Sequence, residues 1–401
     1  MAQRCSFCGE DRRGVDRLVL GHGGVAICGD CARLALELSS APEDSSRDLL
    51  LAGIGTLVTN DPRHGGPLGM LHGAAVAVRN GRVTWLGRQR AVPERYRQLP
   101  LVECEGRMVA PGFVDAHRHL DSDLASNPSH LADSLSSQIG ILVEQGATTV
   151  EFRTWGAPDT EIEARMLAAI GAAGRELPAD VGAGVVVGAD PPPWGRGYRA
   201  MLESVLLPAV AGAATYLDVI VGGPLGSDDA VAVLEAGRRR GMRPRVHVGD
   251  GDGLEVALEA RAVSVDGMWG LESAAEVVAA AGLVMVSIPA VSWIRGRPDP
   301  ARAMWEAGVA VGLGTGCDGG SVPTIPMAMS VAVHHGGLSP EQALWAATRG
   351  GALALEETDR GWISPGAVAD LVVLEAEEAS HIVASPGRDP VVRVVKDGVA
   401  L

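Results

Sequence analysis

Short apolar runs rich in β-branched residues alternate with longer stretches of helical periodicity from about residue 111 onward. Runs of this kind are typical of buried parallel strands, and the stretches between them repeat their apolar positions every three or four residues. Eight such pairs predict an α/β fold, a parallel (β/α)8 TIM barrel. The expected strands are 113–116, 148–154, 182–188, 217–222, 243–248, 262–266, 283–288 and 309–315. The expected helices are 131–145, 159–174, 197–213, 228–240, 272–281, 299–307, 324–335 and 340–349.

The segments on either side of the barrel have the alternating pattern of strands that are buried on one face. In segment 49–110 the dipeptide Asn80-Gly81 marks a hairpin turn, and segment 361–401 contains the similar Asp397-Gly398. We expect the two flanks to pair into one small composite β-sandwich beside a barrel of residues 111–360. The Ser-, Asp- and Pro-rich stretch 40–48 is expected to be a linker that follows an N-terminal module of residues 1–39.

The N-terminal module contains two C-x2-C pairs, Cys5 with Cys8 and Cys28 with Cys31. This spacing lets two knuckles close a tetrahedral thiolate site, so the sequence predicts one structural Zn2+. Four incidental free cysteines are the alternative interpretation. A unit of about 40 residues has too small a core to fold without such a metal, which favours the zinc site.

The formal net charge is −15, from 34 Lys and Arg against 49 Asp and Glu, and it is spread along the chain. This balance argues against a nucleic-acid partner. No signal-like or membrane-length apolar segment is visible, so we expect a cytoplasmic protein without membrane contact. Lys396 is the only lysine, and the predicted barrel therefore has no residue for a lysine Schiff base or for a carboxylated lysine that bridges two metals.

Catalytic groups in a parallel barrel lie at the carboxyl ends of its strands. His117 and His119 end the first expected strand, and residues i and i+2 of a strand point to the same side, so both imidazoles can reach one cation. His247 ends the fifth strand and can face this pair across the mouth, which leaves positions for water and an acidic ligand. Unrelated polar residues at strand ends are the alternative. Further candidates at strand ends are Arg153, Asp190, Asp250, Asp266, Cys317 and Asp318.

The N-terminal segment, with its CSFCG start and its closing ICGDC, resembles the C4 zinc-binding domain of the ClpX unfoldases over its whole length. The resemblance implies a module for dimerisation or protein binding. It does not imply an ATPase, because no GxxxxGKS or GxxxxGKT phosphate loop follows in the chain. Nucleic-acid binding by the module is a second possibility, but acidic residues accompany its arginines, and protein contact ranks first.

Residues 49–401 resemble the amidohydrolase superfamily, and most closely its imidazolonepropionase-like branch. The matching motifs are PGFVDAHRH, GATTVEFRT, VHVGD, AVSVDG, VGLGTGCDGGS, LSPEQALWAATRGGALAL and GWISPGAVADLVVLE. The resemblance implies a mononuclear Zn2+ or Fe2+ site, held here by His117, His119 and His247, that activates water for attack on a C–N bond of a ring. It also implies a small-molecule substrate. We expect a homo-oligomer such as a dimer, in agreement with the dimerisation role that the zinc module suggests.

Several positions depart from the pattern of that family. Gly316 stands where the family carries its metal-facing aspartate, and the sixth strand ends in Asp266-Gly267 in place of Asp-His. The family's carboxylate three residues after the third histidine becomes Asp250. The third strand ends in Gly188-Ala189-Asp190 where the family has a histidine, and an arginine that follows the HxH strand in the family is missing.

These departures remove groups that would grip imidazolonepropionate, and two interpretations follow. In the first, Asp318 is the acidic metal ligand and proton shuttle, Asp250 positions the leaving nitrogen, and Arg153 and Asp190 bind the substrate. The enzyme then hydrolyses a different cyclic amide, amidine or related C–N bond. In the second, the barrel is an inactive scaffold or ligand sensor that is joined to a protein-binding zinc module.

Overall fold

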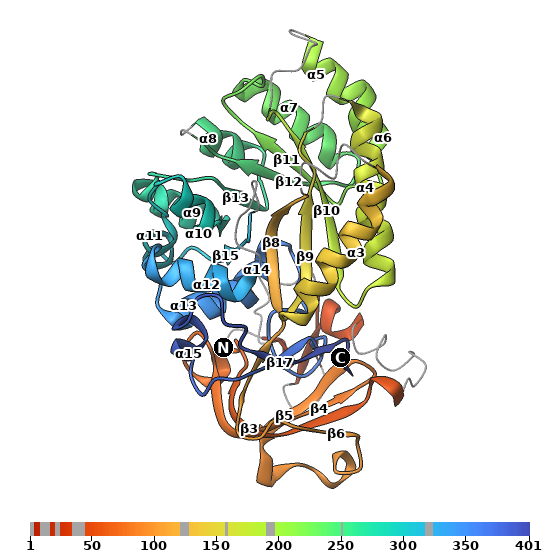
Figure 1. Cartoon of the computed structure of the whole chain (residues 1–401), viewed down its shortest axis with the longest axis vertical. Helices are drawn as coiled ribbons and strands as arrows, with labels where there is room; N and C mark the ends of the chain where they lie inside the picture. Colours follow the sequence, from red (N-terminus) through yellow and green to blue (C-terminus); the bar gives the residue numbers. More distant parts are fainter. Residues whose placement is uncertain are drawn as a thin grey trace.

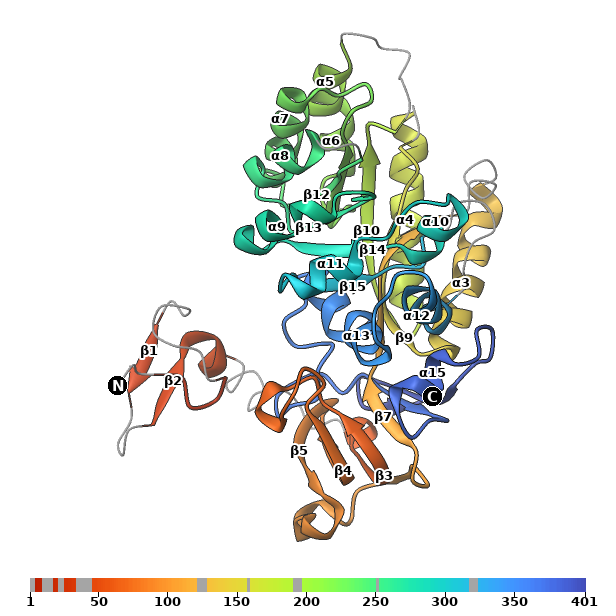
Figure 2. The ribbon, with the colours of Figure 1, turned by 90° about the vertical axis from the view of Figure 1, so that its left-hand side faces the viewer.

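The computed structural model describes residues 4–8, 17–20, 25–33, 45–120, 128–156, 159–189, 197–249, 252–316 and 324–401, with the side chains of 128–130 excepted. Within these ranges the chain forms a parallel barrel, a mixed sheet built from both flanks of the barrel, and a small N-terminal module (Figures 1 and 2). No helix in the described part is long and apolar enough to cross a membrane.

Eight parallel strands form the barrel and pair in the order of the sequence, as predicted. The first and last are joined beyond the end of the last strand, where the His119 amide donates to the Gly316 carbonyl at 2.8 Å and the Gly316 amide to the His117 carbonyl at 2.8 Å. Because the strands run parallel, their carboxyl ends meet at one rim. The strands are β8 Phe113–His119, β9 Ala147–Arg153, β10 Asp180–Val187, β11 Tyr216–Ile220, β12 Arg243–His247, β13 Ser264–Asp266, β14 Val284–Ser287 and β15 Val311–Leu313.

The helices pack on the outside of this barrel (Figure 1). Three of them, α8 Asp252–Glu259, α10 Pro289–Ile294 and α15 Ala379–Val383, are absent from the sequence prediction because five to eight residues are too few to show a helical period. The stretch expected as one helix over 197–213 is divided into α5 Tyr198–Met201, a π-helical segment Leu202–Leu206 and α6 Leu207–Val210, with a proline at the start of α6. The other principal helices are α3 Pro128–Glu144, α4 Thr160–Glu176, α7 Ser227–Arg238, α9 Ala275–Ala281, α11 Ala301–Glu306, α12 Ile325–His334, α13 Pro340–Trp345 and α14 Gly351–Ala354.

The two flanks of the barrel pair with each other beside it, as predicted, and their described strands form one mixed sheet where a sandwich was expected. The connection between the flanks is the antiparallel pair β7 Met108–Pro111 with β16 Leu371–Leu374. Since β7 leads directly into β8, this pair also fixes where the first barrel strand begins. The remaining strands are β3 Leu49–Val58, β4 Met70–Arg79, β5 Arg82–Arg88, β6 Leu101–Glu103, β17 Val391–Lys396 and β18 Val399–Ala400.

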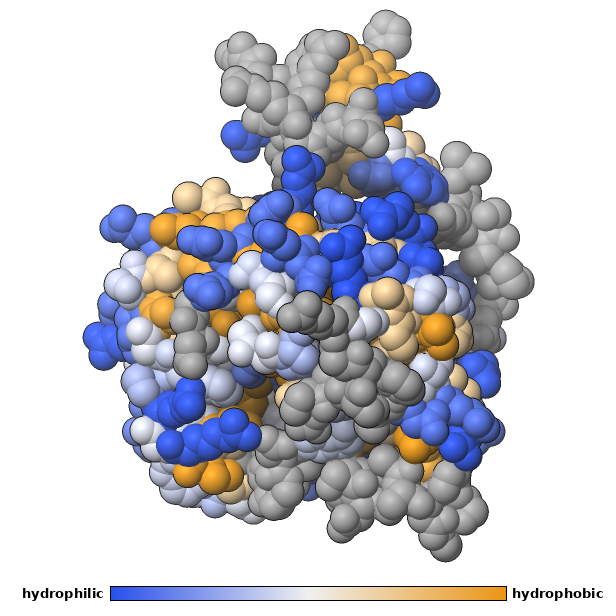
Figure 3. Space-filling view, turned by 90° about the horizontal axis from the view of Figure 1, so that it is seen from above, coloured by the Kyte–Doolittle hydropathy of each residue, from blue (hydrophilic) through white to orange (hydrophobic). Residues whose placement is uncertain are grey.

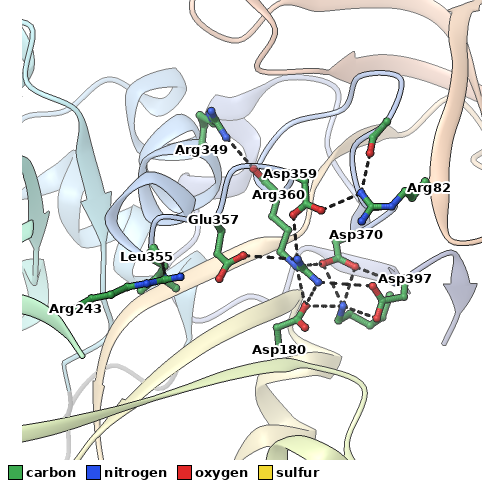
Figure 4. Close-up of polar contacts among 12 residues, drawn as sticks. Arg82, Asp180, Arg243, Arg349, Leu355, Glu357, Asp359, Arg360, Asp370 and Asp397 are labelled. Atoms are coloured by element: carbon green, nitrogen blue, oxygen red, sulfur yellow. Dashed lines mark hydrogen bonds and ion pairs between the residues drawn. The ribbon is translucent and has the colours of Figure 1, made fainter. Parts of the chain in front are cut away.

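A buried group of ion pairs fastens this sheet to the barrel (Figure 4). The side chain of Lys396 is only 4% exposed, and its Nζ lies 2.8 Å from Asp180 at the start of β10, 3.1 Å from Asp370 and 2.8 Å from Asp397. Arg360 reaches Asp180 from the other side at 2.7 Å. The chain's single lysine is therefore a structural residue, which agrees with a barrel chemistry that uses no lysine.

The N-terminal module stands apart from the barrel in Figure 2. Its described part consists of the antiparallel pair β1 Leu18–Leu20 and β2 Ala26–Cys28, followed by helical residues 29–33. β1 lies between the two cysteine pairs, and β2 ends at Cys28, the first cysteine of the second pair. Of the expected linker 40–48, residues 45–47 form a short 3-10 turn, and 40–44 lie outside the described residues.

Candidate active site

Three histidines line one cavity at the carboxyl ends of the barrel strands. His117 and His119 come from the end of β8 and His247 from the end of β12, as expected from the sequence, and the cavity has a volume of about 600 Å³. Its walls are partly apolar and carry two tryptophans. The other lining residues are Trp155, Val186, Ala189, Asp218, Ile220, Trp269, Ile288, Val291, Arg295 and Gly316. Seen from above, hydrophobic residues lie between hydrophilic ones over the described surface (Figure 3).

The carboxylate of Asp266 lies between two of these histidines. Its Oδ2 is 2.9 Å from His117 Nδ1, and its Oδ1 is 2.5 Å from His247 Nδ1. Burial works to raise the pKa of Asp266, but the charges of His117 and Arg153 and the hydrogen bonds of both histidines hold it well below its usual range. An ionised carboxylate can only accept hydrogen bonds, so both Nδ1 atoms carry the proton. In their neutral forms, His117 and His247 would then offer Nε2 as the donor of an electron pair.

His119 is oriented in the same sense by a different partner. Its Nδ1 lies 3.2 Å from the carbonyl oxygen of Thr154, which can only accept, so Nδ1 again carries the proton. The imidazole stacks on Trp155 with 4.6 Å between ring centroids. Burial, together with the charges of His117 and Arg153, lowers the pKa of His119 well below its ordinary value. His119 is therefore a neutral imidazole with a free Nε2.

His247 differs from His119 in its electrostatic surroundings. Burial works against the charged form, but the hydrogen bond and the charge of Asp266 raise the pKa of His247 above its ordinary value. Its ring meets Trp269 edge to face with 5.3 Å between centroids, and Trp269 in turn donates its Nε1–H to Ser292 Oγ at 3.0 Å. The two indoles therefore hold one histidine each on opposite sides of the barrel mouth.

Arg153 holds the carboxylates beneath the histidines. It is fully buried, its Nη1 donates to Asp266 Oδ2 at 2.7 Å and to Asp218, and its Nε donates to Glu151 at 3.1 Å. Arg245 binds the same Glu151 from below. Arg153 is not among the residues found to line the cavity in the described part of the chain. Contact between Arg153 and a substrate stays a prediction, and its observed role is to bind the buried carboxylates.

The two glycines that depart from the family pattern are needed by the packing of this site. A Cβ on Gly267, where φ is +65°, would lie 2.4–2.7 Å from three atoms of the His247 ring. A Cβ on Gly316, where φ is +78°, would lie 2.6 Å from Ile288 Cγ2 and 2.9 Å from Val291 Cγ2. Real Cβ atoms do not approach other atoms so closely, so neither position accepts a side chain without movement of its neighbours.

Asp190, Asp250 and Asp318 lie outside the described residues, as does Cys317. Their expected roles in metal binding, proton transfer and substrate binding stay predictions. Asp266 is the residue whose importance sequence reasoning missed, although it was noted at the end of its strand. The pairing of His247 with Asp266 across β12 and β13 is the signal that places the two side by side.

The donor set of the barrel fits a divalent metal in its chemistry. Each of the three histidines has its Nδ1–H bound by a protein oxygen, the usual arrangement around metal-binding imidazoles, and each turns Nε2 away from that oxygen. Within the described ranges, two sets of side chains bring three or more ligand atoms within 4.8 Å of one another, and the barrel histidines are not one of them. One set, Asp180 with Asp370 and Asp397, already binds Lys396.

The other close set is the cysteine quartet of the N-terminal module, Cys5, Cys8, Cys28 and Cys31. Backbone amides donate to the sulfurs, including Cys28 N to Cys5 Sγ at 3.3 Å and Cys31 N to Cys28 Sγ at 3.4 Å. Burial opposes ionisation, but the backbone amides of Cys8 and Cys28 lower the pKa of Cys5 to about 6. Four converging sulfurs that receive amide hydrogen bonds fit the predicted tetrahedral Zn2+ site.

Two family models match parts of the chain. The amidohydrolase family model matches residues 222–401, and the ClpX C4-type zinc finger model matches residues 3–40. Among curated relatives, an imidazolonepropionase of Mycolicibacterium smegmatis is 34% identical over 391 residues, which cover 87% of this chain and 96% of the relative. An imidazolonepropionase of Streptomyces griseus is 32% identical over 385 residues, which cover 86% of this chain and 97% of the relative.

Solved structures are similar in fold. A triazine hydrolase variant superposes with a TM-score of 0.73 at 15% identity, covering 88% of this chain and 94% of that one. An adenosine deaminase from Xanthomonas campestris with bound zinc gives a TM-score of 0.70 at 20% identity and covers 88% of this chain and 92% of that one. At such low identity these similarities establish the barrel and its adjoining sheet, and nothing finer.

Proposed function

Because the chain belongs to the amidohydrolase family, we propose that its barrel is a metal-dependent hydrolase of a non-peptide C–N bond in a cyclic amide or amidine. The observation that carries the proposal is the orientation of His117, His119 and His247. All three rings have Nδ1–H bound by a protein oxygen, and all three line one cavity. A substrate distinct from imidazolonepropionate is proposed because Gly316 and Gly267 stand where the family pattern has polar side chains.

His117, His119 and His247 would hold one Zn2+ or Fe2+ through Nε2, with Asp318 proposed as the acidic ligand in place of the aspartate that the family carries at position 316. When bound, such an ion supplies a water of lowered pKa and polarises the scissile group. Asp266 keeps two imidazoles in the tautomer that binds metal. Asp250 is proposed to position the leaving nitrogen, and Asp190 and Arg153 to act on the substrate.

Trp155 and Trp269 limit the access of water to the histidines, because each indole lies against an imidazole ring. A site shielded in this way strengthens every electrostatic interaction inside it. Ile220, Ile288 and Val291 add apolar wall to the same cavity. A compact ring with a polarised C–N bond matches a cavity of this volume and polarity.

Metal content tests the proposal directly. The full chain should bind about two metal ions, a chain with Cys5→Ser and Cys8→Ser about one, and a chain with His117→Asn and His247→Asn about one, by elemental analysis after gel filtration. His64→Asn, at an exposed position, is the matched control and should keep both ions. Unchanged metal content in the barrel variant would contradict the enzyme proposal and favour an inactive scaffold or ligand sensor.

The zinc module is proposed to bind protein, either a second copy of this chain to form a dimer or another partner. Its described part exposes four large apolar side chains, Phe7 at 57%, Val19 at 59%, Leu20 at 55% and Val25 at 51%. Exposed apolar residues gathered on so small a unit are typical of an interaction surface. A cytoplasmic location is part of this proposal, since a reducing compartment keeps the four thiols available to zinc.

Sedimentation velocity tests the role of the module. Val19→Ser with Leu20→Ser should lower self-association or partner binding without loss of zinc. The control is Val392→Ser. Val392 is an apolar residue, 47% exposed, on β17 of the mixed sheet built from both flanks. Identical sedimentation and partner capture for the module variant and the control would count against protein binding through this surface.

A further inference from the structure

Asp218 is a buried carboxylate of the cavity wall to which neither the sequence analysis nor the comparisons assign a role. It lies on β11, is 2% exposed, and lines the cavity that contains the three histidines. Its Oδ2 accepts a hydrogen bond from Arg153. Its Oδ1 is buried and accepts no hydrogen bond from any residue in the described ranges. A buried carboxylate oxygen without a partner is costly, so its retention beside the three histidines requires an explanation.

Asp218 and Asp266 form an unequal pair around one guanidinium. The same Arg153 Nη1 donates to both carboxylates, but Asp266 also receives two histidine Nδ1–H groups, whereas Asp218 receives none. Burial raises the pKa of Asp218 and the negative charge of Asp266 adds to this, against the opposing charges of Arg153, His117 and His247. The pKa of Asp266 is shifted in the opposite direction. Two carboxyls whose environments separate their pKa values are suited to different tasks, one to stay ionised and one to exchange a proton.

Because Gly316 carries no side chain, an acid that acts in the cavity has to come from another strand. No carboxylate can extend from residue 316, because even a Cβ there would collide with Ile288 and Val291. The described cavity wall contains one carboxylate, that of Asp218. Within the described lining, the carboxylate available for proton transfer is therefore on β11, on a different part of the rim from the last strand.

We propose that Asp218 is the catalytic acid and base of this barrel, an inference that rests on the proposed hydrolase function. As the oxygen of water bonds to the carbon of the scissile group, a proton of that water passes to the carboxylate of Asp218. The same proton then passes to the leaving nitrogen as the C–N bond breaks, so Asp218 returns to its starting state. The products are the carbonyl compound and the free amine end of the opened ring. The role of proton shuttle that the first interpretation of the sequence gives to Asp318 falls to Asp218, and Asp318 keeps its proposed role as a ligand.

The first test does not depend on activity. Infrared difference spectra between acidic and neutral pH should contain the band of a carboxyl that loses its proton above the ordinary aspartate range. Asp218→Asn should remove this band, and Asp228→Asn, an exposed residue on α7, should keep it. Metal content should be unchanged in both variants. Other buried carboxyls with raised pKa values, such as Asp370, should keep their bands in Asp218→Asn. The absence of any band that Asp218→Asn loses and Asp228→Asn keeps, or an Asp218 carboxyl that titrates in the ordinary range, would overturn the proposal.

The second test uses hydantoin and imidazolonepropionate as cyclic probes. On a probe that the wild type hydrolyses, Asp218→Asn should lower kcat by about 10²- to 10⁴-fold with a small change in KM, and should remove one limb of the pH profile. Asp218→Glu should restore part of kcat and part of the lost limb of the pH profile. If the Asn variant does not fold, the Glu variant can be measured in its place. An unchanged kcat and pH profile would overturn the proposal. A wild type inactive on both probes would instead be a failure of the proposed function for these compounds, and the infrared titration would still decide the state of Asp218.

Discussion

Replacement of Gly267 by alanine should damage the site more than it damages the fold around it. The backbone at Gly267 has φ of +65°, and the new Cβ would lie 2.4 Å from His247 Cε1 and 2.6 Å from its Nε2. The positive φ costs about 1–2 kcal/mol for a residue with a side chain. Overpacking against the imidazole costs about 1–3 kcal/mol more, so the expected loss in the free energy of unfolding is about 2–5 kcal/mol. Relief of the clash requires His247 to leave Asp266, so barrel metal binding should weaken as well.

Gly270→Ala is the matched control for this prediction. Gly270 also has a positive φ, +75°, but a Cβ there would have no atom within 4 Å. It should lose about 1–2 kcal/mol from the backbone alone and keep its metal. Urea-induced unfolding and metal analysis of the two variants then separate the contact with His247 from the backbone strain. Equal losses of stability with equal metal content would refute the packing argument.

Three further predictions concern the buried charges. Asp266→Asn should lower barrel metal content and cost about 3–5 kcal/mol in urea unfolding, because Arg153 keeps a buried charge with one partner fewer; a variant as stable as the wild type would contradict this. Lys396→Met should also cost about 3–5 kcal/mol, because Lys396 is paired with Asp370 inside the protein. The control is Arg302→Met, which breaks an exposed ion pair and should cost about 1 kcal/mol or less. Equal losses in the two variants would show that the buried ion pairs of Lys396 are unimportant for stability. Burial raises the pKa of Asp370 to about 6, although the charge of Lys396 opposes the shift. The folded chain therefore binds the proton of Asp370 more tightly than the unfolded chain does. The resulting stabilisation is complete below the ordinary aspartate pKa and is lost as the pH rises through about 6. The stability difference between wild type and Asp370→Asn should therefore fall across that window in urea titrations, and a difference that is constant with pH would disprove the assignment.

The barrel could be predicted from the sequence because each buried parallel strand is a continuous apolar run, a signal that needs no knowledge of distant residues. All eight expected strands occur, with ends shifted by a few residues, as in Phe113–His119. Short helices such as Asp252–Glu259 were missed because about two turns show no clear period. The histidines were found because strand ends and the i, i+2 rule place them at one rim.

The partners of the histidines could not be predicted, because they depend on which side chains meet inside the barrel. Asp266 was visible as a polar residue at a strand end, but its position between His117 and His247 follows from the closure of the barrel. Arg153 was expected to bind substrate since it also ends a strand. Its guanidinium is instead directed to Glu151, Asp218 and Asp266, a choice that the spacing of residues does not reveal.

The glycine substitutions that suggested a lost active site from the sequence have a different meaning in the structure. A side chain at residue 267 would occupy the space of the His247 ring, and that ring is held 2.5 Å from Asp266 by its Nδ1. Glycine at 267 thus leaves room for the His247 ring in the position where it binds Asp266. At Gly316 the neighbours Ile288 and Val291 fill the corresponding space, while Asp218 supplies a carboxylate from the cavity wall. A site that had only decayed would have no reason to keep three imidazoles with Nδ1 bound to a protein oxygen, together with a buried arginine that binds three carboxylates.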